Sequence, residues 1–449
     1  MGAQRAAPTP VDEPALDLDA YWMPFTANRS FKAAPRLIAS AVGHAYRAPD
    51  GRRILDSLSG LWTTGLGHGR REIADAVHRQ LLTLDYAPAF QVGHEAAFAL
   101  AAEIAALAPP GLDSVFFTNS GSEAVDTALK IALAYQQARG KPGKTRLIGR
   151  ARGYHGANFG GVAVGGMPNN RRAFEGALPA TISHLPSTLD LARNTFVRGQ
   201  PIYGAEFADA LSEEIARHGA DAIAAVIVEP VSGSSGVLPP PLGYLQRLRA
   251  LCDAHDILLI FDEVITGFGR LGAPFAAQRF GVTPDIICFA KGVTNGAVPL
   301  GGVVARRGVH DALMQGPAHA VEFFHGYTYS GHPVAVAAAR ATLALLRQEN
   351  SFDAARRLED AFAERLHAVR GARHVIDIRS MGLMGGIELA SRPDAPGARG
   401  LEVHARCFAR GALVRNGGDV LQFAPFFDHT PDEIDRIFSI VESVLAETE

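Results

Sequence analysis

The middle of the chain alternates between apolar runs and segments with helical periodicity. Short continuous apolar runs occur at residues 115–117, 224–228, 257–261 and 286–289. The spacing of amphipathic helices occurs at residues 94–108, 122–139, 205–218 and 241–255. Strands that are apolar on both faces and alternate with helices are typical of a parallel sheet covered on both sides. The pattern therefore predicts an α/β fold with a mostly parallel central sheet.

The two ends of the chain follow a different pattern. The first twenty or so residues indicate a flexible lead-in, and residues 45–56 predict two short strands around a Pro-Asp-Gly turn. A long Ala-rich helix is expected at 333–349, followed by helices at 354–370 and 430–447 and strands at 374–379, 384–389 and 420–424. These elements predict a smaller α+β domain built from both termini. We divide the chain into an N-terminal segment of the small domain (1–80), a large domain (81–330) and a C-terminal small domain (331–449).

Composition excludes several classes of partner. A net charge of −3, from 43 basic and 46 acidic residues, leaves no electrostatic footprint for nucleic acid. No apolar run approaches the roughly 18 residues that cross a bilayer, and the N-terminus lacks the apolar core of a signal peptide. The cysteines (Cys252, Cys288 and Cys407) are far apart, which favours free thiols in a reducing compartment. We expect a cytoplasmic protein that acts on small molecules.

Two apolar runs end close to a charged residue. The run 257–261 leads into Asp262, and the run 286–289 leads through Ala290 into Lys291. Ligands of open parallel sheets bind outside the carboxyl ends of the strands, so both side chains are expected at one crevice. A lysine there can form a Schiff base with an aldehyde cofactor, and a carboxylate can pair with a pyridine nitrogen. The alternative is a buried structural ion pair or a lysine that extends to solvent.

Two further segments favour a phosphate-bearing, planar ligand. The small-residue turn at Ser120, Gly121 and Ser122 precedes a helix, and free backbone N–H groups at a helix start bind anions. Its alternative is an ordinary helix cap. Tyr154 and His155 lie on a turn between two glycines, where an aromatic ring can cover a flat cofactor. Plain packing explains such a turn equally well.

Three other features bear on the ligand. Residues 267–272 match GxGxxG, but no clear helix follows and the next strand ends near lysine rather than at a ribose-binding acid, which argues against a nicotinamide cofactor. The histidines at 325 and 332 lack the spacing of metal ligands, and no metal is expected. Arg415 follows a short apolar run and precedes Asn416 and two glycines, which suits capture of a substrate carboxylate. A surface ion pair is its alternative.

In their order along the chain, these segments resemble the class III aminotransferases of the fold type I pyridoxal-phosphate (PLP) enzymes. The resemblance runs from about residue 20 to the C-terminus. Within that class, the chain is most similar to the ω-amino acid:pyruvate aminotransferases (β-alanine:pyruvate transaminases). The segments that carry the resemblance are 21–29, 57–62, 148–156, 261–270 with Lys291, and 414–419.

The resemblance implies a role for each site residue. Lys291 would carry PLP covalently and shuttle the substrate proton, and Asp262 would pair with the pyridine nitrogen. The resemblance also implies a cofactor site made of Gly121, Ser122, Tyr154, His155, Glu229, Val264 and, from the partner subunit of a homodimer, Thr328. Val264 and Tyr154 would lie on opposite faces of the ring. Substrate contacts would come from Phe25, Trp62 and Arg415.

The implied reaction is transamination between an ω-amino acid and pyruvate, giving a semialdehyde or other carbonyl product and L-alanine. Another class III donor (a diamine, an arylalkylamine, taurine or 4-aminobutyrate) and a PLP aminomutase remain open, as does the pairing of dimers into a tetramer. Close relatives commonly have Cys where Thr64 stands, Gln where Gly292 stands and an aromatic residue where Asn416 stands. These departures leave the chemistry intact but bear on the shape of the pocket.

Overall fold

The computed structural model describes residues 16–449. Its largest sheet has eight strands in the order β4-β11-β10-β9-β8-β5-β6, with β7 also pairing with β5. The strands are β4 (Leu112–Thr118), β5 (Arg146–Ala151), β6 (Gly165–Gly166), β7 (Ile182–Leu185), β8 (Ile223–Val228), β9 (Leu258–Asp262), β10 (Ile286–Phe289) and β11 (Gly301–Arg306). Only β11 is antiparallel to its neighbours, β10 and β4. The prediction of a mostly parallel sheet is therefore confirmed.

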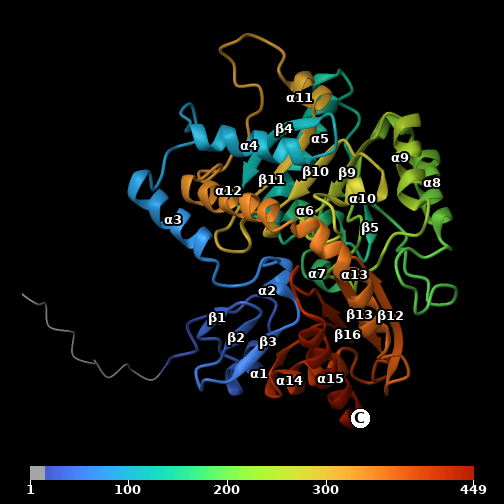
Figure 1. Cartoon of the computed structure of the whole chain (residues 1–449). Helices are drawn as coiled ribbons and strands as arrows, with labels where there is room; N and C mark the ends of the chain where they lie inside the picture. The colour runs from blue at the N-terminus through green and yellow to red at the C-terminus, as the bar shows by residue number, and fades with distance from the viewer. Residues whose placement is uncertain (1–15) are drawn as a thin grey trace, which may run out of the picture.

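Helices cover both faces of this sheet (Figure 1). α5 (Gly121–Ala138) packs on one face, where its apolar side chains meet Ile227, Ile260 and Cys288. The apolar side chains of the opposite face pack in a second core, to which four helices, among others, contribute. These are α4 (Glu95–Leu107), α9 (Tyr244–Ala254), α10 (Ala276–Phe280) and α12 (Pro333–Gln348). Because alternate residues of each strand face the two cores, the strands read as continuous apolar runs.

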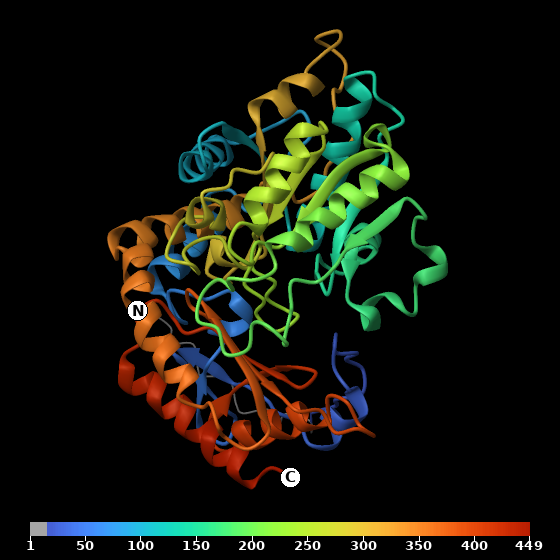
Figure 2. The same ribbon diagram turned by 90° about the vertical axis from the view of Figure 1, so that its right-hand side faces the viewer.

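Two smaller sheets lie below the large one, and one of them joins the two ends of the chain (Figures 1 and 2). Its strands are β1 (Ser40–Val42), β2 (Ala45–Arg47), β3 (Arg53–Asp56) and β14 (Ala412–Leu413), and β14 pairs in parallel with β3. The other contains β12 (Val375–Met381), β13 (Met384–Leu389), β16 (Val420–Phe423) and β15 (Arg415–Gly417), all antiparallel. Packed with them are α13 (Ser351–His367), α14 (Ala398–Ala409) and α15 (Pro431–Glu447). A smaller α+β region built from both termini is thus confirmed, whereas the boundaries at residues 80 and 330 stay a prediction.

Several elements differ from the sequence expectation. The sequence pattern did not predict α3 (Arg71–Thr83). The helix expected at 205–218 begins with a short 3₁₀ turn, and its α-helical part, α8, covers only Ala210–His218. The pattern also did not predict β5, because arginine and glycine interrupt its apolar character. The remaining short helices are α1 (Asn28–Ala33), α2 (Ser59–Trp62), α6 (Phe159–Val164), α7 (Pro168–Arg171) and α11 (Arg307–Leu313). Most of the expected flexible lead-in falls on residues 1–15, outside the described part of the chain. Within residues 16–449, no helix is long and apolar enough to span a bilayer.

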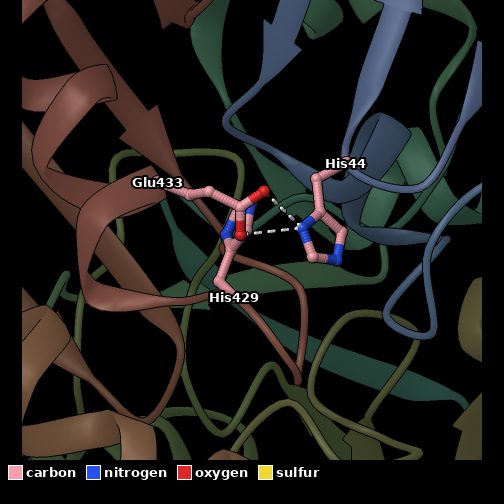
Figure 3. A group of neighbouring side chains, drawn as sticks. All are labelled: His44, His429 and Glu433. Atoms are coloured by element: carbon pink, nitrogen blue, oxygen red, sulfur yellow. Dashed lines mark hydrogen bonds and ion pairs between the residues drawn. The ribbon is translucent and has the colours of Figure 1, made fainter.

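A histidine cluster ties the β1–β2 turn to the start of α15 (Figure 3). His44 donates from Nδ1 toward both carboxylate oxygens of Glu433, each at 3.1 Å, and from Nε2 to Asp428 Oδ1 at 2.9 Å. The ring of His429 lies 4.4 Å from that of His44, and its Nδ1 accepts from the backbone N of Phe426. The side chains of His44, His429 and Glu433 are close enough together to share a metal ion. The Glu433 carboxylate already caps α15 through Thr430, so hydrogen bonds account for the arrangement.

The pKa values of His44 and His429 are shifted in opposite directions. Burial would lower the pKa of His44, but the hydrogen bonds and charges of Asp428 and Glu433 outweigh burial and raise it. Burial and the neighbouring charge of His44 depress the pKa of His429. A raised histidine pKa stabilises the folded state below the unfolded pKa of about 6.5, and this contribution is lost as pH rises. A depressed one destabilises the folded state as pH falls below the same value.

We predict opposite pH dependences for two matched variants. Relative to the parent protein, His44→Gln should lose more stability at about pH 6 than at about pH 8.5, because the contribution of the raised His44 pKa is present at the lower pH and is lost as pH rises. His429→Gln should lose less at the lower pH, because it removes a group that resists protonation. Urea unfolding midpoints at both values measure the effect. Parallel pH trends in the two variants would contradict this account.

Candidate active site

The site forms where β9 and β10 end side by side. The two strands are parallel, with Cys288 of β10 opposite Asp262, the last residue of β9. Lys291 follows β10 after Ala290 and begins a short 3₁₀ turn, η4 (Lys291–Thr294), with a left-handed φ of 50°. Parallel strands present their carboxyl ends at one edge. The register therefore brings Asp262 and Lys291 to the same edge of the sheet, where their charges interact.

The environment of Lys291 favours its neutral amine. Burial lowers the pKa of Lys291 to about 8, and the positive charge of Arg415 acts in the same direction. The carboxylates of Asp262 and Glu229 oppose this shift without cancelling it. Lys291 makes no salt bridge within residues 16–449, so the structural ion pair considered above does not form there. An amine with a lowered pKa is a better nucleophile and proton acceptor near neutral pH.

Asp262 is held in one orientation by two contacts. Its Oδ2 accepts from His155 Nδ1 at 2.8 Å, and its Oδ1 accepts from the backbone N of Val264 at 3.1 Å. Both His155 and Asp262 are buried. A carboxylate fixed in this way, next to an imidazole, can present negative charge to a cationic ring nitrogen.

Glu229 fixes the turn that carries Tyr154. Its Oε1 accepts from the backbone N of Tyr154 at 2.9 Å, and its Oε2 accepts from the backbone N of Gly233 at 3.1 Å. Burial raises the pKa of the Glu229 carboxyl. The charges of Asp262, Arg415 and Glu229 all act on the Tyr154 hydroxyl, so this ring lies among the site residues. Behind it, Arg150 donates to the backbone O of Glu229 at 2.7 Å.

The start of α5 leaves open backbone where an anion can approach. The Ser120 side chain caps the helix by accepting from Glu123 N, so the ordinary helix cap considered above as the alternative is present at this residue. The amides of Gly121 and Ser122 donate to no other group in residues 16–449. A Cβ at Gly121 would lie 2.8 Å from Cγ1 of Val264, which means that a larger residue would close the approach. The turn thus fits a phosphate held by two backbone N–H groups.

Arg415 enters the site from the small antiparallel sheet. Its Nε donates to Gln422 Oε1 at 3.0 Å, and it has no salt bridge within residues 16–449. Burial lowers its pKa, against the opposing effect of Tyr154. The expected alternative of a surface ion pair is therefore not found there. A partly buried guanidinium without an acidic partner is suited to bind a carboxylate.

The remaining predicted residues occupy different surroundings. Phe25 is 79% exposed and meets Tyr154 edge to face, with ring centroids 6.5 Å apart. Trp62 is only 3% exposed and lines a small cavity with Phe268 and Gly292. Thr328 lies in an exposed turn, where its backbone O accepts from Tyr86 Oη, and it joins none of the contacts above. Pocket roles for these residues stay predictions.

The sequence pattern missed two buried polar residues near the site. Arg150 supports Glu229, and Gln422 contacts Arg415. A signal was present in both cases, because each is a polar residue inside a strand whose other positions are mostly apolar. A buried polar side chain inside an apolar strand is costly unless it finds hydrogen-bond partners, so such a residue indicates a contact with another part of the fold.

The sheet order and the pair of strand ends define a fold type I enzyme of the PLP-dependent transferases. Residues 26–445 match the family model described as aminotransferase class-III. The chain is 56% identical to the ω-aminotransferase of Caulobacter vibrioides, covering 97% of this chain and 99% of the relative. It is 52% identical to the β-alanine–pyruvate aminotransferase of Pseudomonas aeruginosa, covering 96% of each.

Solved structures agree with this assignment. The chain superposes on an (S)-enantioselective ω-transaminase from Thermomicrobium roseum with a TM-score of 0.89 and 34% identity, covering 96% of this chain and 97% of that one. An amine transaminase of an uncultivated Pseudomonas species, solved in a PLP-bound form, gives a TM-score of 0.87 at 35% identity, covering 96% and 99%. The protein belongs to the class III aminotransferase family, and its cofactor is PLP.

We predict that Gly156→Ala weakens the site. Gly156 has a φ of 100°, and a Cβ there would lie 2.7 Å from Cα of Ser122. The turn at Gly121 and Ser122, at the start of α5, would therefore have to shift. The variant should lose about 1–3 kcal/mol of stability and bind PLP less tightly. Gly140→Ala is the control, because φ is also positive there (73°) but no atom lies within 4 Å. Cofactor retention on dialysis should fall only in Gly156→Ala.

Proposed function

We propose that this protein transfers the amino group of an ω-amino acid, β-alanine or a similar donor, to pyruvate, giving a semialdehyde and L-alanine. The two relatives at 56% and 52% identity are named for ω-amino or β-alanine–pyruvate transfer, and a Pseudomonas putida relative named for ω-amino acid–pyruvate transfer is 51% identical. The observation that carries the proposal is the guanidinium of Arg415, which lies beside Tyr154 and Lys291 and has no acidic partner in the described part of the chain. It gives the site a place for the carboxylate that β-alanine and pyruvate share.

The residues at the strand ends fit PLP. Gly121 and Ser122 would hold its phosphate, and Asp262, oriented by His155, would pair with the ring nitrogen. Val264 and Tyr154 would enclose the ring, while Glu229 keeps the Tyr154 turn in place. Lys291 would hold the cofactor covalently. When bound, PLP supplies an electron sink for the bond that breaks next to the amino nitrogen.

The chain's own residues then position the donor and move one proton. Arg415 would bind the carboxylate end of the donor and so direct its amino end toward Lys291. The Nζ of Lys291 would take the proton from the carbon that bears the amino nitrogen and would later act as the acid that gives a proton back. Its lowered pKa suits both directions of transfer. Pyruvate is aminated by the same groups in reverse order, with Arg415 holding its carboxylate.

A homodimer would complete the site. Large apolar side chains are exposed around the Thr328 turn and the neighbouring α4 region. They are Phe90, Val92, Phe98, Phe324 and Tyr329. An exposed apolar surface of this kind is typical of a subunit interface. A second copy packed there would bring its Thr328 toward the turn at Gly121 and Ser122, as the family resemblance implies.

We also propose that the protein is located in the cytoplasm.

We predict that borohydride reduction of the holoenzyme fixes the cofactor on Lys291. Peptide mass spectrometry should find the pyridoxyl group on the peptide that contains this residue. Lys291→Ala should lose both the label and nearly all transamination, because its amine is required twice. A label on another lysine, such as the buried Lys144, would reject the assignment.

We predict that Arg415→Ala separates carboxylate donors from simple amines. For β-alanine, kcat/KM should fall by about tenfold to a hundredfold, the cost of a lost hydrogen bond between charged groups. Propylamine, which lacks the carboxylate, should change by no more than about twofold. Arg415→Lys keeps the positive charge but cannot donate two parallel hydrogen bonds to a carboxylate. Its kcat/KM for β-alanine should therefore lie between those of the parent protein and Arg415→Ala. Equal losses on both donors would show that Arg415 does not bind the carboxylate.

A further inference from the structure

Gln422 is a buried polar residue in an otherwise apolar strand. β16 has the sequence Val420-Leu421-Gln422-Phe423, and the Gln422 side chain is 0% exposed. A buried carboxamide is costly unless both its donor and its acceptor find partners. The partners of Gln422 therefore indicate what the residue does.

Both ends of this carboxamide are engaged. Its Nε2 donates to the backbone O of Ser234 at 2.9 Å, and its Oε1 accepts from Arg415 Nε at 3.0 Å. A carbonyl oxygen can only accept, so Ser234 decides which end of the amide turns toward the arginine. Arg415 and Gln422 are also opposite each other in the β15–β16 pair. The strand register and Ser234 together fix the amide oxygen against the guanidinium.

The contact joins two parts of the fold. Ser234 lies in the loop after β8, next to Gly233, whose amide donates to Glu229. Gln422 belongs to the small sheet, and it thereby connects Arg415 to the edge of the large sheet. Gly417 leaves room for this connection, because a Cβ there would lie 2.9 Å from Nε2 of Gln422.

The contact leaves the substrate-facing part of the guanidinium available. Only Nε of Arg415 is bound by Gln422, and Nη1 and Nη2 donate to no group in residues 16–449. Two parallel N–H groups of a guanidinium match the two oxygens of a carboxylate. A held guanidinium also loses less rotamer freedom when the substrate binds. Since Gln422 is neutral, it orients Arg415 without competing for its charge.

We infer that Gln422 is a positioning residue that sets the preference for carboxylate-bearing donors by orienting Arg415 through its amide oxygen. This inference rests on the proposed role of Arg415 as the carboxylate site. Within residues 16–449, the Gln422 side chain hydrogen-bonds to Arg415 and Ser234. Its influence is expected on the binding of carboxylates and not on the chemical step.

Two near-isosteric variants test the inference in the holoenzyme. Gln422→Met removes both hydrogen bonds, and Gln422→Glu places a carboxylate against Arg415. For Gln422→Met, KM for β-alanine and the inhibition constant of propionate should each rise about tenfold, with kcat changed by less than about twofold. Propylamine should be unaffected. Gln422→Glu should weaken β-alanine and propionate further, because its charge competes with theirs.

A second comparison separates this inference from the proposed function. In an Arg415→Ala background, Gln422→Met should add no further loss for β-alanine, because its effect acts through the arginine. If Arg415→Ala spares β-alanine, the proposed carboxylate site itself is wrong. If Arg415→Ala is selective but both Gln422 variants leave KM unchanged, or impair β-alanine and propylamine alike, the positioning role alone is overturned. PLP content and thermal midpoint are measured in each variant to identify general loss of structure.

Discussion

The parallel pairing of β9 with β10 is the constraint on which the site depends. With Cys288 opposite Asp262, the carboxylate and the Lys291 amine reach one edge of the sheet, and a register shift would separate them. Continuous burial of both strands maintains this register, because each face packs against its own core. The same burial lowers the pKa of Lys291. Packing that stabilises the sheet therefore also prepares the amine for its reaction.

The second requirement is that the antiparallel sheet containing β15 and β16 places the Arg415 guanidinium near the edge of the large sheet. β15 and β16 belong to the region built from both termini, and the parallel pairing of β14 with β3 joins those termini. Arg415 therefore depends on contacts between distant parts of the chain. On the proposed function, such an arrangement would let the surroundings of Arg415 vary while the ends of β9 and β10 remain the same. Phe25 is exposed and contacts Tyr154 edge to face.

The sequence predicts the sheet and the strand-end chemistry because both are local. Apolar runs locate β8, β9 and β10, and the charged residues after two of them locate the site. β11 was not among the predicted strands, and an apolar run would not encode whether its strand is parallel or antiparallel. The bonds from His155 to Asp262 and from Gln422 to Ser234 join residues 107 and 188 positions apart, and no spacing rule connects them. Local patterns thus identify the reacting groups, whereas the groups that orient them depend on tertiary structure.

The choice of an amide as the partner of Arg415 follows from the electrostatics of the whole site. A carboxylate at position 422 would hold the guanidinium more strongly, but it would occupy the charge that a substrate carboxylate needs. It would also offset the positive field that helps to lower the pKa of Lys291. A neutral acceptor avoids both effects, because it fixes geometry and leaves the charge unbalanced until the substrate arrives. On the proposed function, the site therefore contains a cation whose position is set by the protein and whose counter-charge would be supplied by the substrate.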